Sequence, residues 1–78
     1  MKTVTVYGPG CAKCRQAEEL VRRVAAEIGA QVQVEKASDV QAIVKAGILA
    51  TPAVAVDGVV KVSGRVPKEN EVRAWIAE

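Results

Sequence analysis

The feature that most constrains the fold of this chain is a repeated switch between two hydrophobic periods. Segments in which apolar residues alternate, as they do in strands, are separated by segments in which apolar residues recur at helical spacing. Glycine or proline stands at most of the boundaries. Because the chain has only 78 residues, we expect residues 1–78 to form one domain with a simple core.

The pattern predicts the element order β-α-β-α-β-β-α. Strands are expected at 2–7, 31–36, 53–56 and 59–62, with an Asp57-Gly58 hairpin turn between the last two. Helices are expected from Ala12 to a cap at Gly29, at 40–45 after a Ser38/Gln41 capping box, and near the end of the chain with Pro67 in the first turn. The 53–56 strand is apolar throughout and should be central. We therefore predict an α/β sandwich, a four-stranded mixed sheet with helices on both faces.

Composition excludes several classes of function. Eleven basic and nine acidic residues are interspersed and leave a net charge of +2, so neither nucleic acid nor a membrane surface is indicated as a partner. There is no histidine, which removes Cys-His nucleophile pairs and histidine metal ligands. No apolar run approaches the length of a membrane span, and the segment Met1–Tyr7 resembles a strand more than a signal peptide. We therefore expect a cytoplasmic protein.

The only two cysteines lie in the sequence Cys11-Ala12-Lys13-Cys14, between the first strand and the first helix. In a cytoplasmic protein such a pair is more often catalytic or metal-binding than structural. A cysteine at a helix N-terminus is favoured as the reactive thiolate, and Cys14 follows Cys11 by about one turn, so that a short disulfide is possible. Lys13 adds positive charge beside the pair, and Gly10 leaves room for a partner to approach, so both are candidates for tuning the site.

Together with other residues, this motif gives the chain a family resemblance. It resembles the small thioredoxin-fold, redox-active disulfide proteins of bacteria and archaea, which include thioredoxins and glutaredoxin-like proteins. The matching segments are Tyr7-Gly8-x-Gly10-Cys11-x-x-Cys14, Thr51-Pro52 before the third strand, Val56-Asp57-Gly58, and Gly64-Arg65-Val66. The resemblance covers nearly the whole chain.

The resemblance implies a thiol–disulfide oxidoreductase that exchanges a Cys11–Cys14 disulfide with protein disulfides through a mixed disulfide. Cys11 would be the nucleophile and Cys14 the resolving residue. Thr51 and a cis Pro52 would shape the groove for the substrate. No cofactor and no metal is implied. The expected partners are disulfide-containing protein substrates and, as electron donor, an NADPH-linked reductase or glutathione. The simplest expectation for the oligomeric state is a monomer.

The chain also departs from larger thioredoxins. Its motif is Cys-Ala-Lys-Cys instead of Trp-Cys-Gly-Pro-Cys, and the preceding strand offers Thr3 and Thr5 where that family has a buried carboxylate. The acceptor of the Cys14 proton is therefore open, with water and Lys13 as candidates.

Two other classes of function remain open. One is a carrier of a soft metal ion such as Cu(I), which two thiolates would suit. Against it, small heavy-metal-binding domains usually run β-α-β-β-α-β, whereas this sequence predicts a helix between the second and third strands and a helix at the end. The other is a non-catalytic interaction domain that has kept a redox fold.

Overall fold

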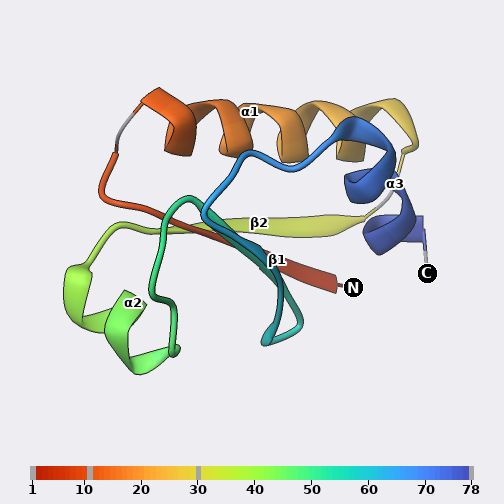
Figure 1. Cartoon of the computed structure of the whole chain (residues 1–78). Coiled ribbons are helices and arrows are strands. Elements are labelled where there is room, and N and C mark those ends of the chain that lie inside the picture. Colours follow the sequence, from red (N-terminus) through yellow and green to blue (C-terminus); the bar gives the residue numbers. More distant parts are fainter. Residues whose placement is uncertain (1, 11, 30, 78) are drawn as a thin grey trace.

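The computed structural model describes residues 2–10, 12–29 and 31–77 and has the predicted order of elements (Figure 1). The strands are β1 (Lys2–Tyr7), β2 (Val32–Ala37), β3 (Ala53–Val56) and β4 (Val59–Ser63). The helices are α1 (Ala12–Glu27), α2 (Val40–Lys45) and α3 (Glu69–Ala77). Within the described ranges, no helix combines the length and the apolar character needed to cross a membrane.

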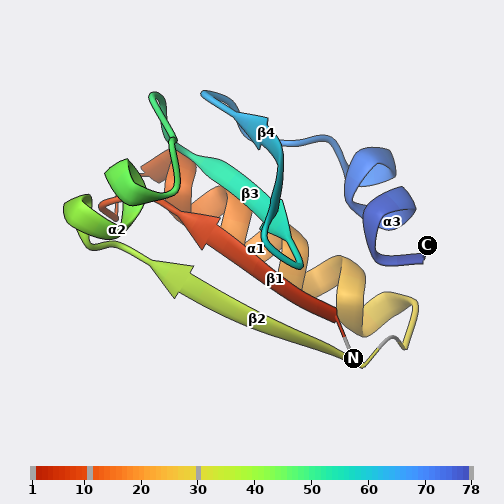
Figure 2. The same ribbon diagram turned by 90° about the horizontal axis from the view of Figure 1, so that it is seen from below.

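The strands form one mixed sheet in the order β2-β1-β3-β4 (Figure 2). Strand β1 pairs in parallel with β2 and antiparallel with β3, and β3 pairs antiparallel with β4. All residues of β3 are buried, and the strand lies in the interior of the sheet, as its apolar sequence predicts. The register of β3 against β4 shifts between Val54 and Ala55, which marks a bulge in this outer pair.

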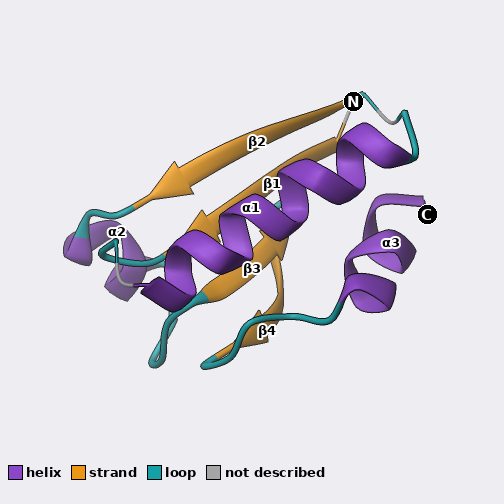
Figure 3. Cartoon of the chain, turned by 90° about the horizontal axis from the view of Figure 1, so that it is seen from above, coloured by secondary structure: helices purple, strands orange, loops and turns teal. Residues whose placement is uncertain are grey.

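Helices cover both faces of the sheet, which confirms the predicted sandwich. Helices α1 and α3 lie over one face, and α2 lies over the other face near the end of β1 (Figures 1 and 3). Because successive strand residues point to opposite faces, Val4 and Val6 face the main core with α1 and α3, whereas Tyr7 faces α2. Under α2, Tyr7 packs on a smaller buried cluster of Ile43, Ile48 and Ala53.

Local details differ from the predicted ones. Helix α2 is capped by Asp39, whose carboxylate accepts a hydrogen bond from the Gln41 backbone N–H at 3.0 Å, so the Ser38/Gln41 capping box is wrong. Helix α3 begins at Glu69, after Lys68, so Pro67 precedes the helix and does not lie in its first turn. Strand β2 begins and ends one residue later than predicted. In each case the type of element is predicted correctly and only its first or last residues differ, because the hydrophobic period defines the middle of an element better than its ends.

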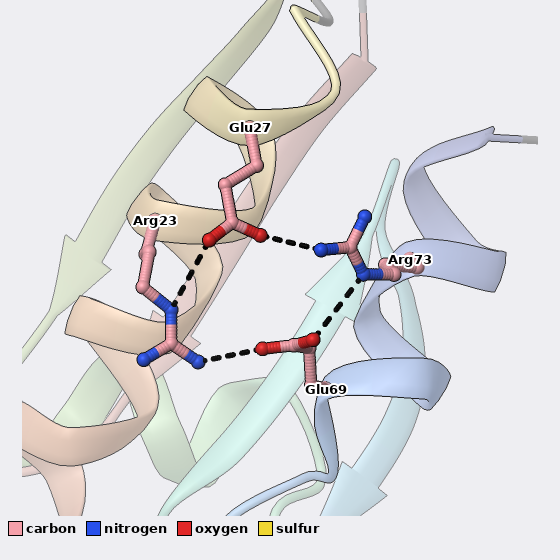
Figure 4. Close-up of polar contacts among 4 residues, drawn as sticks. All are labelled: Arg23, Glu27, Glu69 and Arg73. Atoms are coloured by element: carbon pink, nitrogen blue, oxygen red, sulfur yellow. Dashed lines mark hydrogen bonds and ion pairs between the residues drawn. The ribbon is translucent and has the colours of Figure 1, made fainter.

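A ring of charged side chains joins α1 to α3 across the surface of the main core (Figure 4). Arg23 contacts Glu69 at 2.9 Å and Glu27 at 3.9 Å, and Arg73 contacts Glu69 at 3.4 Å. The ring is closed by an ion pair between Arg73 and Glu27. Each of its two pairs between the helices joins residues that lie 46 positions apart in the sequence. The ring lies above the apolar contact that α3 makes with the core through Val72 and Ile76.

Candidate functional site

Cys14 lies in the first turn of α1 with its side chain buried, only 3% exposed. The periodicity of the helix explains this burial, because Cys14, Ala17, Val21 and Val24 follow one another on the face that points to the sheet. The preceding residue of the motif, Lys13, lies on the exposed side of the helix. The predicted nucleophile, Cys11, lies outside the described residues.

Gly8, which directly follows β1, packs against Cys14. It is buried, and its backbone N–H donates a hydrogen bond of 2.9 Å to the carbonyl oxygen of Ala37 at the end of β2. A Cβ atom placed on Gly8 would lie 2.3 Å from the sulfur of Cys14 and 2.8 Å from its Cβ. Both distances are shorter than real Cβ contacts allow, so the backbone at this position lies directly against the cysteine. The sequence indicated a turn at this glycine and did not reveal the contact with Cys14.

The peptide bond between Thr51 and Pro52 is cis, the geometry that the family resemblance implies. Pro52 is buried and Thr51 is half-buried. Tyr7 is the partner of Ala53 in the β1–β3 pair, so the next residue, Gly8, continues toward Pro52. The strand register therefore brings the cis proline to the same end of the sheet as Gly8 and Cys14.

A second loop lies beside the cis proline. The backbone N–H of Gly64 donates a hydrogen bond of 2.9 Å to the Pro52 carbonyl oxygen. The loop before β3 and the loop after β4 consequently run side by side at this edge (Figures 2 and 3). In the first of these loops Ile48 points inward and is buried, whereas the neighbouring Leu49 is fully exposed, at 100%. A large apolar side chain thus stands in solvent two residues before Thr51.

The two candidates for tuning have separate roles in the local geometry. Gly10 is exposed and has a φ of 98°, a conformation that residues with a side chain rarely adopt, so glycine suits the turn that leads into α1. Lys13 is exposed at the start of that helix. Their influence on the reactivity of the cysteine pair stays a prediction.

Arg65 lies in this second loop, after β4, and its guanidinium forms an ion pair with Glu71. It donates hydrogen bonds of 2.8 and 2.9 Å to the two carboxylate oxygens of Glu71, which also accepts one from the Lys68 backbone N–H. The Arg65 guanidinium is the main cause that lowers the pKa of Glu71 to about 2, and the Lys68 bond lowers it further. The same pair raises the pKa of Arg65. Sequence reasoning did not find this pair, which ties the loop after β4 to the start of α3.

The buried part of the described chain carries no acidic, basic or other polar side chain. Thr3 and Thr5 of β1 are half-buried and supply no carboxylate. Among the described residues, no three or more His, Cys, Asp or Glu side chains are grouped as a metal ion would require. The side chains buried together with Cys14 in the described chain are therefore apolar.

Comparison with known proteins identifies the family. Residues 2–77 match the family model described as a thioredoxin domain. A thioredoxin of the archaeon Methanothermobacter thermautotrophicus is 37% identical over 73 residues, covering 94% of this chain and 95% of that protein. A thioredoxin of Methanocaldococcus jannaschii is 33% identical over 73 residues, covering 94% of this chain and 84% of that protein. The chain therefore belongs to the thioredoxin domain family. At the level of this family, the comparisons support thiol–disulfide oxidoreduction as the activity.

Proposed function

We propose that this thioredoxin-family chain works as a single-domain, monomeric thiol–disulfide oxidoreductase in the cytoplasm. It would exchange a Cys11–Cys14 disulfide with disulfides in protein substrates. Cys11 acts as the nucleophile, Cys14 as the resolving residue, and Thr51 with Pro52 forms the wall of the substrate groove.

The burial of Cys14 is the observation that carries this assignment. A thiol that is 3% exposed and packed against the Gly8 backbone cannot be reached by a disulfide in another folded protein. The other cysteine of the chain stands only three residues earlier in the sequence, a spacing that allows a disulfide within the motif. The buried cysteine therefore suits the second, intramolecular step, which leaves the first attack to Cys11.

Two exchange steps make up the proposed reaction. In the first, the Cys11 thiolate attacks one sulfur of the substrate disulfide, so that a mixed disulfide forms and one substrate thiolate leaves. In the second, the Cys14 sulfur attacks Cys11 and loses its proton, while the second substrate sulfur leaves and is protonated. The substrate disulfide has then gained two electrons, and the chain carries the Cys11–Cys14 disulfide.

The groove beside the pair is assigned to an extended segment of the substrate. The register of β3 against β1 brings Thr51 to the end of the sheet where Cys14 lies, and the exposed Leu49 stands two residues away. We propose that the Thr51 backbone pairs with the substrate segment and that Leu49 adds an apolar contact. An NADPH-linked reductase or glutathione would then restore the dithiol, and the two donors are separate arms of the experiment below.

Trapping the intermediate tests the proposal. The Cys14→Ser variant should accumulate a covalent adduct with a disulfide substrate such as insulin, detected by mass, because the resolving sulfur is missing. The Cys11→Ser variant should form none, since its remaining thiol is buried. The unmodified chain should reduce insulin catalytically when it is supplied with either NADPH and a thioredoxin reductase or reduced glutathione.

The same samples distinguish the alternative functions. Helix α2 between β2 and β3, and α3 at the end, differ from the order expected of small heavy-metal-binding domains. Binding of one Cu(I) through both thiols, without a reversible disulfide, would overturn the proposal in favour of a metal carrier. Adducts of equal yield in the two serine variants would overturn the assignment of roles. Full retention of partner binding in Cys11→Ser, together with no insulin reduction by the unmodified chain, would indicate a non-catalytic interaction domain.

A further inference from the structure

Gly8 has no conformational need to be glycine. Its φ lies outside the positive range, unlike that of Gly10. Its backbone is a regular continuation of β1, fixed by the hydrogen bond to Ala37. Glycine is therefore needed at this position for steric reasons, because the Cys14 side chain occupies the volume that a Cβ atom on residue 8 would take.

We infer that Gly8 is a positioning residue for the exchange reaction, which sets the place of the Cys14 sulfur by leaving that volume open. The inference rests on the proposed function. Both residues are held in place: Gly8 by its hydrogen bond to Ala37 and by the pairing of the preceding Tyr7 on either side of β1, and Cys14 by the backbone of α1. An added methyl group can be accommodated only if the cysteine gives way.

The geometry indicates how the cysteine would move. Rotation about χ1 could carry the sulfur away from the 2.3 Å contact, but helices disfavour one of the three rotamers, so few positions are available. Rotation cannot relieve the 2.8 Å contact, because that contact involves the Cys14 Cβ atom itself. The first turn of α1 must therefore shift as well, and the sulfur leaves its buried position.

A displaced sulfur should slow the second exchange step more than the first. Disulfide formation needs the two sulfurs to approach to about 2.05 Å with a restricted dihedral angle. In positioned reactions, a misplacement of about 1 Å can cost roughly a hundredfold in rate. The attack of Cys11 on an external disulfide does not involve the Cys14 sulfur, so it should change much less.

Reaction with dithiobisnitrobenzoate separates the two steps. Cys11 first forms a mixed disulfide with the reagent and releases one coloured thiolate in a bimolecular phase. Cys14 then displaces the second thiolate in a phase whose rate is independent of reagent concentration. In Gly8→Ala we expect the second phase to slow by about tenfold or more and the first to stay within about twofold of the unmodified chain.

A matched glycine variant controls for loss of stability. Gly29 lies at the other end of α1 with a φ of 66° and no atom near its Cβ position, so Gly29→Ala strains the backbone without touching the cysteine. Its two phases should both match those of the unmodified chain. An equal slowing of the second phase in both variants, or an unchanged second phase in Gly8→Ala, would overturn the inference.

A double variant keeps the test decisive if Gly8→Ala unfolds. Cys14→Gly removes both atoms that the new methyl group would meet. The loss of urea midpoint caused by Gly8→Ala should therefore be smaller in the Cys14→Gly background than with Cys14 present, whereas the loss caused by Gly29→Ala should be the same in both. An equal loss from Gly8→Ala in both backgrounds contradicts the inference. Absence of a second phase in the unmodified chain would instead contradict the proposed function.

Discussion

The ring of Arg23, Glu27, Glu69 and Arg73 offers a direct measure of what surface charge contributes to the docking of α3. The test is a double-mutant cycle on Arg23 and Glu69, which form one of the two links between the helices. Each residue is replaced by alanine alone and together with the other. The coupling free energy is the part of the loss that the two substitutions share.

The solvent exposure of the four side chains determines how large a coupling free energy we expect. The four side chains of the ring are 41–57% exposed, so solvent screens each pair strongly. Exposed pairs contribute about 0.2–1 kcal/mol each. We therefore expect a coupling of about 0.5 kcal/mol for Arg23 with Glu69, and roughly 1 kcal/mol for both links between the helices. In a domain of this size, about 1 kcal/mol corresponds to roughly 4–8 °C in Tm.

Urea unfolding at two salt concentrations is the assay, because urea adds no ions. Raising NaCl from about 0.1 M to about 1 M shortens the screening length from about 10 Å to about 3 Å, so the coupling should fall toward zero. The matched control is the cycle on Arg22 and Glu18, a pair within α1 at 3.0 Å that does not bridge helices. A coupling that is unaffected by salt, or above about 2 kcal/mol, would refute the argument from exposure.

Three further predictions follow from other contacts. Because Arg65 holds the pKa of Glu71 at about 2, below its ordinary value of 4.5, the carboxylate stabilises the folded chain above pH 4.5, and this stabilisation is lost as the pH falls through about 2. Glu71→Gln should therefore flatten the fall of the urea midpoint over that range. Leu49→Ala should raise KM for insulin without changing reactivity toward a small disulfide, and it should move the free energy of unfolding by less than about 0.5 kcal/mol because the side chain is fully exposed. Val54→Ala should cost about 2–3 kcal/mol in urea unfolding, since it removes two buried methyl groups and leaves a cavity, whereas Val59→Ala, at a site 57% exposed, should cost under about 0.5 kcal/mol.

The fold was predictable because the two hydrophobic periods are distinct in this sequence. The all-apolar strand 53–56 indicated an interior position, and β3 has that position. The pattern did not predict the exact residues at which the elements begin and end. Ser38 and Asp39 are both good helix-capping residues, and only the observed start of α2 at Val40 shows that Asp39 is the cap.

The candidate site was predictable to the level of its motifs. The Cys-x-x-Cys motif singled out the cysteine pair, and the family resemblance singled out Thr51-Pro52, whose peptide bond is cis. The roles of these residues in exchange stay predictions. Gly8 was different. A glycine in a sequence does not reveal whether it serves a positive φ or a close approach, and that choice is settled here by a cysteine on another element.

The burial of Cys14 is the observation on which the proposed division of roles between the two cysteines rests. The buried part of the described chain contains no charged side chain that could activate Cys14, and β1 carries threonines where larger family members have a carboxylate. A sulfur enclosed by the Gly8 backbone and the first turn of α1 is closed to external disulfides, so in the proposed cycle it reacts only with the mixed disulfide formed at Cys11. Intramolecular exchange is therefore the step that we assign to Cys14, and we propose that the loop with the exposed Leu49 and the half-buried Thr51 selects among protein substrates.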